Sequence, residues 1–349
     1  MEHRLAINGY GRVGQCVLRA LYEGGYRKDA RVVAVNDLSG TDAVCYLTRY
    51  DTTHGRFPGL VSCDGSVMNV NGDAIETLRE ENPARLPWAE LGVDLVLECT
   101  GTLRDRAAAA VHLVAGAARV LVSNPADTAV DATVVFGVNQ ETLSATHRVV
   151  SNASCSTNCV VPVLQVLDEG LGVEHGVITT VHSAMNDQPA VDTSHHPDLR
   201  RSRSAMQSII PVDTALARGI ERLLPGMAGR FEAVAMRVPT INVSVIDLTV
   251  QVRSAASVET VNRLLRGAAR ERFQGILGYT EEPLASCDFN HDARSAIVDG
   301  SQTRVSGEHL VKVLCWFDNE WGYANRMLDT SLTWLRKVEA AEQGRAVGG

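Results

Sequence analysis

Continuous apolar runs alternate with helical stretches through the first half of the chain. Such runs predict strands at residues 5–8, 31–36, 93–99, 119–123 and 132–138. Apolar spacing predicts a helix at 12–23, and an alanine-rich stretch predicts another at 106–115. Strands that are apolar on both faces and separated by helices are typical of a mainly parallel sheet covered on both sides. The first half is therefore expected to be a doubly wound α/β domain.

The second half has a different period. Residues 241–252 alternate apolar with polar side chains almost without interruption, as in a strand with one face solvated or at an interface. A helix is expected after Ser257, because serine is a preferred N-cap. A strand at 309–317 and a closing helix at 321–338 complete the pattern. We expect an α+β domain with a mainly antiparallel sheet.

Between these patterns, residues 183–204 are polar and have no clear period. Unpatterned stretches of this length are usually functional loops or disordered segments. The total of 349 residues fits two domains, at roughly 150 residues for each.

Composition narrows the class of protein. Apolar residues make up 45% and charged residues 21%, as in an ordinary soluble globular chain. The formal net charge of −8 argues against a general nucleic-acid binder, which needs a basic face. No apolar stretch reaches the roughly 20 residues of a membrane helix, and residues 1–5 do not resemble a signal peptide. We therefore expect a cytoplasmic protein with neither a nucleic-acid nor a membrane partner.

Eight cysteines are scattered along the chain: Cys16, Cys45, Cys63, Cys99, Cys155, Cys159, Cys287 and Cys315. In a long chain without a signal peptide, we expect reduced thiols rather than disulfides. Cys155 and Cys159 are four residues apart, but no second pair at a recognised ligand spacing accompanies them. No metal site is therefore expected.

The residues after the first expected strand match the dinucleotide-binding fingerprint G-x-G-x-x-G. Gly9, Gly11 and Gly14 are its glycines, with Arg12 and Val13 between the last two. Because the motif follows a strand and opens a helix, its backbone N–H groups and the helix N-terminus can hold a pyrophosphate. The fingerprint predicts a Rossmann-type nucleotide-binding domain.

An acidic residue, Asp37, follows the next expected strand and lies 23 positions after Gly14. A carboxylate there accepts hydrogen bonds from the adenosine ribose hydroxyls and repels a 2′-phosphate. The predicted cofactor is therefore NAD rather than NADP. The alternative is a glycine-rich packing turn in which Asp37 caps a helix.

A polar turn, residues 151–159, leads into an apolar helix and contains Cys155. A cysteine at a helix N-terminus is a candidate nucleophile, because the helix dipole favours its thiolate and nearby N–H groups can hold an oxyanion. His182 ends the apolar run 176–181 and can serve as the base. The alternatives are a small buried apolar cysteine and a structural histidine.

Arginines are concentrated beyond His182, at Arg200, Arg201, Arg203 and Arg237. In an acidic chain this clustering suggests a phosphate-bearing ligand, since the arginine fork matches phosphate oxygens. A solvated loop face or an ion pair at a subunit interface is the alternative.

Five motifs resemble the glyceraldehyde-3-phosphate dehydrogenase superfamily over essentially the whole chain. They are residues 7–14, 50–55, 151–159, 237–240 and 318–323. The resemblance implies an NAD-binding domain of residues 1–154, completed by a C-terminal helix at 319–349, and a catalytic domain of residues 155–318. It also implies a homotetramer.

The resemblance assigns roles to individual residues. Cys155 would form a thiohemiacetal with an aldehyde, His182 would activate the thiol, and hydride transfer to NAD would leave a thioester. Asn319 would hold the nicotinamide carboxamide. The residues that would bind the substrate and its phosphate are Ser154, Ser156, Arg201, Thr214, Ala215 and Arg237.

Three departures from the glycolytic members resemble the branch that oxidises D-erythrose 4-phosphate. They are Met185 at a usual threonine anion site, the run 209–215, and the runs 289–292 and 295–300. This branch makes 4-phosphoerythronate for pyridoxal-phosphate biosynthesis. Two features depart from the usual pattern of the branch: Ser156 replaces a common threonine, and residues 193–196 are one residue longer.

The acyl acceptor is predicted to be water. Met185 cannot donate a hydrogen bond to a second anion, and Asp213 adds negative charge beside Thr214. One alternative is a phosphorylating glyceraldehyde-3-phosphate dehydrogenase. The other is a redox-sensing NAD-binding regulator that uses Cys155 as a switch.

Overall fold

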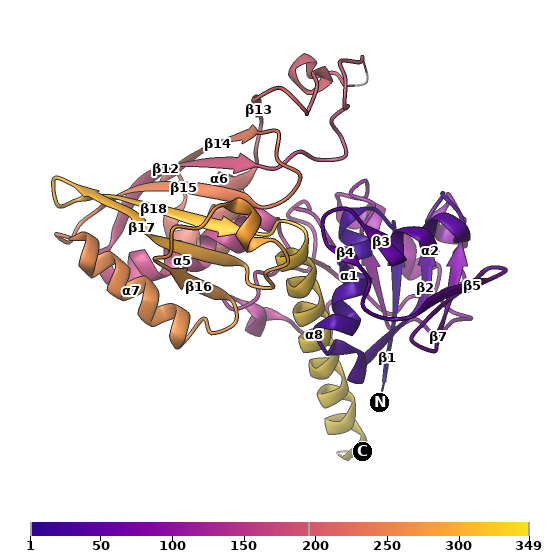
Figure 1. Ribbon diagram of the computed structural model, residues 1–349. Coiled ribbons are helices and arrows are strands. Elements are labelled where there is room, and N and C mark those ends of the chain that lie inside the picture. The colour runs from indigo at the N-terminus through magenta and orange to yellow at the C-terminus, as the bar shows by residue number, and fades with distance from the viewer. Residues whose placement is uncertain (1, 195, 348–349) are drawn as a thin grey trace. The chain divides into compact units, whose positions relative to one another are not determined.

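The structure is a computed structural model that describes residues 2–194 and 196–347 (Figure 1). His195 of the longer 193–196 segment and residues 348–349 of the expected C-terminal helix lie outside the described residues. Two compact units make up the chain. The first comprises Met1–Ser154 with Ala324–Gly349, and the second comprises Cys155–Tyr323.

Nine strands of the described residues form the sheet of the first unit, in the order β10-β11-β9-β8-β1-β2-β7-β6-β5. Neighbouring strands from β10 to β7 are parallel, whereas β5, β6 and β7 pair antiparallel. The strands are β1 (His3–Asn8), β2 (Ala30–Asn36), β5 (Val61–Asp64), β6 (Val67–Val70), β7 (Asp73–Leu78), β8 (Leu95–Glu98), β9 (Val120–Val122), β10 (Ala132–Thr133) and β11 (Val149–Ser151). The predicted α/β class of this half is confirmed.

Helices of the first unit follow the predicted periodicity with one interruption. They are α1 (Arg12–Glu23), α2 (Thr41–Arg49), α3 (Arg106–Ala109) and α4 (Val111–Val114). The expected helix at 106–115 is thus broken at Ala110, where the N–H of Leu113 bonds the carbonyl three residues back at 2.9 Å. This tighter turn separates α3 from α4.

The expected strand at 132–138 is mostly wrong, because β10 ends at Thr133. The N–H of Val135 donates to the side chain of Asn139 at 2.8 Å, and Asn139 N–H bonds back to the carbonyl of Val135 at 3.2 Å. Gly137 has a φ of 94°. A local turn therefore takes up the groups that a longer strand would have paired.

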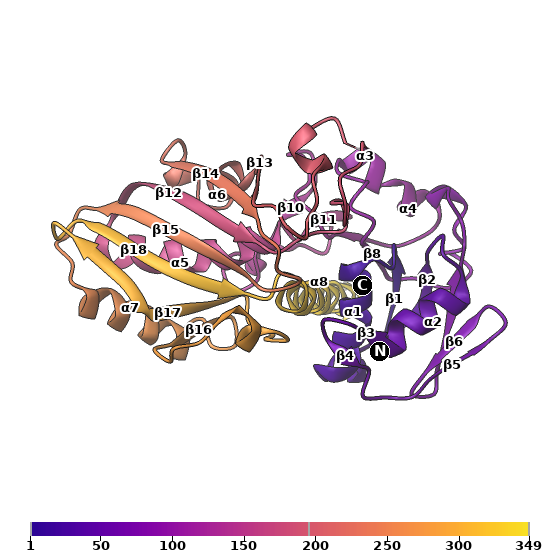
Figure 2. The same cartoon turned by 45° about the horizontal axis from the view of Figure 1, so that its top comes forward.

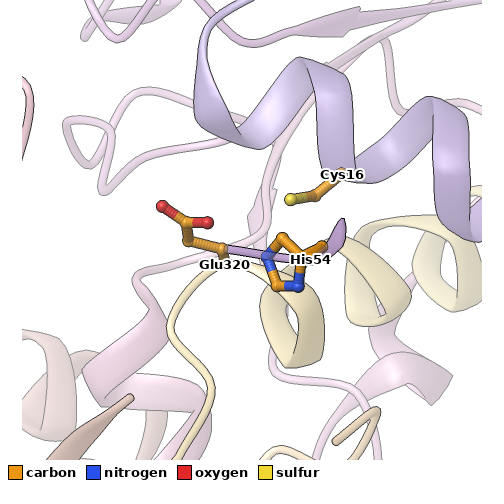
Figure 3. Close-up of side chains that lie close together, drawn as sticks. All are labelled: Cys16, His54 and Glu320. Atoms are coloured by element: carbon orange, nitrogen blue, oxygen red, sulfur yellow. The ribbon is translucent and has the colours of Figure 1, made fainter. Parts of the chain in front are cut away.

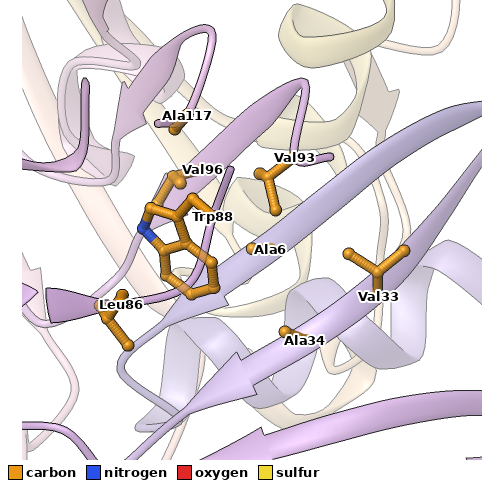
Figure 4. Close-up of a cluster of buried hydrophobic side chains, with 8 residues drawn as sticks. All are labelled: Ala6, Val33, Ala34, Leu86, Trp88, Val93, Val96 and Ala117. Carbon is orange, nitrogen blue, oxygen red and sulfur yellow. The ribbon is translucent and has the colours of Figure 1, made fainter. Parts of the chain in front are cut away.

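Trp88 belongs both to a cluster of buried apolar side chains, shown in Figure 4, and to a buried polar network. The indole N–H of Trp88 donates to Nδ1 of His112 at 3.0 Å, so Nε2 of His112 donates to Glu98 at 2.9 Å. Glu98 also accepts from Asn8 at 2.7 Å and from the N–H of Thr100 at 2.8 Å. These hydrogen bonds to Glu98 hold the carboxyl ends of β1 and β8 together.

The hairpin of β3 (Tyr50–Asp51) and β4 (Gly55–Arg56) is tied to α1. Asp51 accepts two hydrogen bonds from Arg12, at 2.7 and 3.0 Å, and one from the N–H of His54 at 3.0 Å. These hydrogen bonds anchor the first turn of α1 through Arg12. Further along α1, Cys16 projects near His54, with its sulfur within 4.8 Å of a ring nitrogen (Figure 3).

The expectation that every cysteine is a free thiol is wrong. Cys45 of α2 and Cys63 of β5 form a disulfide, with their Cα atoms 6.5 Å apart. The fold brings the two residues together across 18 positions of sequence, a pairing that their spacing alone does not reveal.

Helix α8 (Trp321–Val347) contributes most of its length to the first unit. Trp334 donates to the carbonyl of Ser144 at 2.9 Å, and Thr330 donates to the side chain of Asn152 at 2.8 Å. Tyr26 donates to Asp329 at 3.1 Å. The C-terminal helix thus binds three separate segments of this unit.

The second unit contains a sheet in the order β13-β14-β12-β15-β18-β17-β16. All described pairs are antiparallel except β12–β14 and β16–β17, so the predicted mainly antiparallel sheet is confirmed. The strands are β12 (Val173–His182), β13 (Ile210–Val212), β14 (Phe231–Arg237), β15 (Ser244–Val252), β16 (Leu277–Thr280), β17 (Ala296–Ser306) and β18 (Leu310–Phe317).

Three helices accompany this sheet: α5 (Cys155–Leu171), α6 (Leu216–Leu223) and α7 (Val258–Arg270). Figures 1 and 2 show α5 and α7 along the same face of the sheet. Ser257 accepts from the N–H of Thr260 at 3.1 Å, which confirms it as the N-cap of α7.

Strand β15 begins three residues later than the alternation predicts. Val243 has a φ of 64°, a left-handed conformation that no strand adopts, so the strand starts at Ser244. Within it, Ile246, Leu248 and Val250 are buried while the intervening side chains are half-exposed. The alternation therefore separates a helix-covered face from an open one.

Short 3₁₀ turns connect the larger elements: η1 (Tyr26–Lys28), η2 (Pro83–Arg85), η3 (Gln140–Thr142), η4 (Leu199–Ser202), η5 (Pro225–Met227) and η6 (Ser286–Phe289). Within the described part of residues 183–204, η4 is the only regular element. None of the helices among the described residues has the length and apolar character needed to cross a bilayer.

Trp88→Phe is expected to destabilise the first unit by about 1–3 kcal/mol. The substitution leaves the buried Nδ1 of His112 without its donor, and an unsatisfied buried acceptor costs about this much. Urea titration of the variant and the unsubstituted chain measures the difference. Coincident unfolding curves would show that the indole hydrogen bond contributes nothing to stability.

Candidate active site

The glycine fingerprint forms an open cradle at the start of α1. A Cβ on Gly9, whose φ is +89°, would lie 2.7 Å from the backbone nitrogen of Thr100. A Cβ on Gly14 would lie 2.2 Å from the carbonyl oxygen of Gly9, whereas one on Gly11 would meet nothing within 4 Å. Gly9 and Gly14 thus permit close packing, and Gly11 faces open space.

A cavity of about 460 Å³ extends from this cradle. Its lining includes Gly9, Gly11, Asn36, Asp37, Thr100 and Leu103. Val13 and Arg12 lie in the first turn of α1, where the leading N–H groups of a helix lack intrahelical partners. Because the guanidinium of Arg12 is bound to Asp51, the group through which Arg12 can bind an anion is its backbone N–H.

Asp37 lies at the edge of this cavity and is held by the loop around it. Its carboxylate accepts from the N–H of Tyr10 at 2.8 Å and from the N–H of Ser39 at 2.9 Å. Burial acts to raise the pKa of Asp37, but the hydrogen bonds from Ser39 and Tyr10 outweigh it and lower that pKa. Because the N-cap of α2 is Gly40, the alternative in which Asp37 caps this helix is wrong.

These features fit a dinucleotide. The space beside Gly11, which any side chain there would fill, is open. The N-terminus of α1 favours a pyrophosphate, and the carboxylate of Asp37 borders the same cavity. Of the predicted cofactor residues, Gly9, Gly11 and Asp37 line this one pocket, while Arg12, Val13 and Gly14 lie beside it at the start of α1.

Cys155 is the first residue of α5, directly after a strained turn. Ala153 has a φ of 56°, which costs a non-glycine residue roughly 1–2 kcal/mol. Its N–H donates to the side chain of Ser151 at 3.1 Å. The turn holds Cys155 at a helix start, as the sequence predicts.

His182 lies at the end of β12 and faces this cysteine. Its Nε2 is 3.7 Å from the sulfur of Cys155. On the other side of the ring, Nδ1 lies 2.8 Å from the carbonyl oxygen of Ser183, which can only accept. Nδ1 therefore carries the proton, and the Nε2 lone pair faces the thiol.

The thiol and the imidazole are both neutral in the free chain. Burial raises the pKa of the Cys155 thiol, against the lowering effect of Ser156, whose hydroxyl oxygen lies 4.0 Å from the sulfur. Burial also lowers the pKa of His182, against the backbone of Ser183. The expectation of a lowered thiol pKa is thus wrong here, because desolvation outweighs the local donors.

Cys159 lies one turn further along α5 and is fully buried. Burial raises the pKa of its thiol well above the ordinary value. A fully buried thiol is a poor nucleophile, and of the two cysteines only the half-buried Cys155 is accessible.

Two predicted phosphate residues, Arg201 of η4 and Arg237 of β14, meet at a residue that the sequence analysis did not select. Asp187 forms ion pairs with both arginines, and its Oδ2 accepts from Nη2 of Arg237 at 3.3 Å. Arg237 is also the register partner of His182 on the neighbouring strand β12. The arginine pair therefore lies beside the base.

The other predicted phosphate residues are more dispersed. Thr214 and Ala215 lie between β13 and α6, and the hydroxyl of Thr214 accepts from the N–H of Leu216 at 3.2 Å. The negative charge that contacts these two arginines is that of Asp187, a residue that the sequence analysis did not select.

Ser154 and Ser156 flank the nucleophile in sequence, and both are half-buried. Met185 lies in the loop after His182, with 45% of its surface exposed. Its thioether side chain has no hydrogen-bond donor.

Asn319 is held with its amide in a defined orientation. Its Oδ1 accepts from the hydroxyls of Ser183, at 3.0 Å, and Ser244, at 2.7 Å. The adjacent Asp318 accepts from the N–H groups of Glu320 and Trp321 and fixes the turn. Nδ2 is consequently the donor that Asn319 can offer to a carbonyl-bearing ligand.

Sequence reasoning missed Asp187, Ser183 and Ser244. Asp187 stands in the same run as Met185, but nothing in the sequence shows that it meets Arg201 and Arg237. The two serines had no signal, since they are separated by 61 positions and meet only through the pairing of β12 with β15.

Two known protein domains match the chain. Residues 3–106 match the NAD binding domain of glyceraldehyde 3-phosphate dehydrogenase, and residues 154–319 match the C-terminal domain of the same enzyme. The first match agrees with the fingerprint and the cavity at Asp37, and the cofactor is NAD.

Gly11→Ala is expected to weaken NAD binding, whereas Gly14→Ala is expected to lower the stability of the fold. The added methyl group of Gly11→Ala meets open space, so the variant should fold normally and lose about tenfold or more in NAD affinity by crowding the pyrophosphate. Gly14→Ala places a methyl group against the carbonyl of Gly9 and should lower the thermal midpoint. Calorimetric titration with NAD and thermal unfolding measure both. Unchanged NAD affinity in Gly11→Ala would show that the pyrophosphate does not bind against the backbone at Gly11.

Alkylation of Cys155 by iodoacetamide in the cofactor-free chain should accelerate steadily from about pH 7 to about pH 9. The raised thiol pKa means that thiolate forms only as the pH approaches and passes the ordinary thiol value, and the lowered pKa of His182 leaves no imidazolium to stabilise it earlier. Peptide mass spectrometry follows the modified fraction, with the exposed Cys287 as an internal comparison. A rate that is already constant near pH 6 would reveal a thiolate–imidazolium pair instead.

Proposed function

We propose that this chain, which belongs to the glyceraldehyde 3-phosphate dehydrogenase superfamily, oxidises D-erythrose 4-phosphate to 4-phosphoerythronate. The observation that carries the proposal is the placement of Arg237 opposite His182, which faces Cys155. An aldehyde at the cysteine and a phosphate at the arginines can then belong to one small molecule. A phosphorylated sugar aldehyde is the substrate class that fits.

Catalysis begins at the neutral pair. As the sulfur of Cys155 attacks the aldehyde carbon, Nε2 of His182 accepts the thiol proton, and a thiohemiacetal forms. The hydrogen bond from Nδ1 to the carbonyl of Ser183 keeps the ring in the required tautomer throughout. Ser154, Ser156 and the N–H groups at the start of α5 are the donors available to the developing oxyanion.

Gly9, Gly11 and Asp37 line the pocket that would hold NAD, and Gly14 lets the first turn of α1 pack closely beside it. By the family resemblance, Nδ2 of Asn319 would serve the nicotinamide carboxamide. Bound NAD would supply the acceptor for the hydride of the substrate carbon. The acyl group is then joined to Cys155 as a thioester, and Nε2 of His182 releases to solvent the proton that it took from the thiol, so that the imidazole is again free to act as a base. Arg201, Arg237, Thr214 and Ala215 would bind and orient the phosphate of the substrate.

Hydrolysis completes the cycle. Nε2 of His182 takes a proton from water while the water oxygen attacks the thioester carbon, and the carbon–sulfur bond breaks. The sulfur leaves as the thiolate and regains a proton, and the product is a free carboxylate. The exposed Met185, which offers no donor to a second anion, supports water rather than inorganic phosphate as the acceptor.

The proposal has a cellular setting that follows from the resemblance. It includes a cytoplasmic homotetramer and a product that enters pyridoxal-phosphate biosynthesis. The half-exposed face of β15 supports association through the sheet of the second unit, because alternation of this kind is typical of a strand with one face solvated or at an interface.

NADH formation tests the function directly. In phosphate-free buffer, erythrose 4-phosphate should give NADH and 4-phosphoerythronate, with a higher kcat/KM than glyceraldehyde 3-phosphate. Cys155→Ala should abolish turnover and retain NAD binding, because the dinucleotide pocket is built from other residues. Absorbance at the NADH band and mass spectrometry of the product provide the measurements.

Cys159→Ala is the matched control, since it removes a buried thiol on the same helix and should retain most of the activity. Strict dependence on added phosphate, or preference for the triose, would assign the chain to the phosphorylating enzymes. NAD binding without turnover of either aldehyde would favour a redox-sensing regulator.

A further inference from the structure

The cavity that would hold NAD has an acidic wall in addition to Asp37. Its lining includes Glu80 and Glu81, two neighbouring residues of the loop that follows β7, and we call this pair the acidic wall. None of the described residues that line the cavity is basic. Arg79, which comes directly before the pair, is exposed and does not belong to the lining. Three carboxylates therefore border the cofactor space.

The loop that carries the acidic wall is bound to the end of β2, beside Asp37. Oδ1 of Asn36 accepts from the N–H of Glu80 at 2.9 Å, and Nδ2 of Asn36 donates to the carbonyl of Glu80 at 3.0 Å. The N–H of Asp37 donates to the carbonyl of Leu78 at 3.1 Å. These hydrogen bonds hold the backbone of Glu80 against the residue that precedes Asp37.

A buried carboxylate sets the orientation of the amide that binds this loop. Nδ2 of Asn36 also donates to Oδ1 of Asn8 at 2.7 Å, and Nδ2 of Asn8 donates to the fully buried Glu98 at 2.7 Å. Because a carboxylate only accepts, Asn8 must turn its oxygen toward Asn36. The carboxylate of Glu80 itself accepts from the N–H of Asn82 at 2.8 Å. Both the backbone and the charge of Glu80 therefore have defined positions.

This arrangement bears on one part of a dinucleotide, the adenosine ribose. In a fingerprint of this type, an acid in the position of Asp37 binds the ribose hydroxyls. A phosphate monoester on that ribose carries about two negative charges at neutral pH. Repulsion between like charges extends over several ångströms and is stronger where protein replaces water. The acidic wall is therefore positioned to repel such a phosphate independently of Asp37.

We propose that Glu80 and Glu81 are specificity-determining residues that, together with Asp37, exclude dinucleotides with a phosphate on the adenosine ribose. Removal of Asp37 alone then leaves NADP excluded, because the charge of the acidic wall remains. The inference concerns the cofactor rather than the aldehyde, so it goes beyond the proposed function. It requires only that the adenosine ribose binds at Asp37.

The double variant Glu80→Gln/Glu81→Gln tests the inference. Glutamine keeps the length of the side chain and an oxygen for the N–H of Asn82, but it carries no charge. Calorimetric titration of the full chain should show NADP binding at least about tenfold tighter than in the unsubstituted chain, and NAD binding within about twofold of it. The single variant Glu81→Arg should also bind NADP more tightly, because its guanidinium matches phosphate oxygens. Since Glu81 is exposed, this second variant does not depend on tolerance of a buried change.

Salt separates repulsion from a steric effect. Repulsion is screened, so raising sodium chloride from about 0.05 M to about 1 M should increase the NADP-to-NAD affinity ratio of the unsubstituted chain. The same ratio should change less in Glu80→Gln/Glu81→Gln. A ratio that responds equally to salt in both chains would contradict a role for the charge of the acidic wall.

Glu76→Gln/Glu90→Gln is the matched control, since it changes the net charge by the same amount at two exposed residues of the first unit that do not line the cavity. It should bind NADP as the unsubstituted chain does. An equal gain in the control would overturn the inference, as would unchanged NADP affinity in an acidic-wall variant that keeps its thermal midpoint.

Asp37→Asn provides the remaining comparison. It should bind NADP more weakly than the triple variant that also carries Glu80→Gln and Glu81→Gln, and equal NADP affinity in the two would assign the exclusion to Asp37 alone. All of these titrations proceed without an aldehyde. A chain inactive on erythrose 4-phosphate would refute the proposed function, while the binding results would still decide the role of the acidic wall.

Discussion

The turn between β11 and α5 is the constraint on which the rest of the site depends. It holds Ala153 in a left-handed conformation and leaves Cys155 as the first residue of a helix. Ser151 and Asn152 fix the turn through hydrogen bonds to the backbone and to Thr330. The strain is tolerated because the neighbouring strand and helices over-determine the backbone, and it directs one sulfur toward one imidazole nitrogen.

The two arginines of the site are paired with a carboxylate, and burial favours the uncharged forms of its cysteine and histidine. Cys155 is half-buried and His182 is buried, and desolvation raises the pKa of the thiol and lowers that of the imidazole, so the uncharged form of each is favoured. The arginines beside them are charged, and Asp187 compensates them. A phosphate that bound these arginines would therefore exchange one set of paired charges for another.

The parts of the fold that the sequence predicted are those with local causes. Helix α1 begins at Arg12 because the fingerprint glycines end a strand there, and α7 begins after its serine cap. Cys155 could be located for the same reason, since a polar turn before an apolar helix places it at the helix start. In each case, neighbouring residues alone determine the structure.

The parts that the sequence did not predict depend on contacts between distant segments. The disulfide of Cys45 with Cys63 joins residues whose spacing carries no signature. The thiol pKa of Cys155 depends on burial by the folded unit, which outweighs the local donors. Val243 interrupts an alternating pattern by a backbone conformation that side-chain periodicity does not report. Asp187 gains its ion pairs only when η4 and β14 bring Arg201 and Arg237 to it.

The first unit is discontinuous in sequence, since α8 joins it only after the whole of the second unit has been passed. During synthesis on the ribosome, residues 1–154 emerge well before the helix that binds Ser144, Asn152 and Tyr26. The second unit, Cys155–Tyr323, has all of its residues available before that helix appears. The nucleotide-binding unit is therefore the later of the two to be completed, although its residues are made first, and a nascent chain must keep the surface that awaits α8 from aggregating in the meantime.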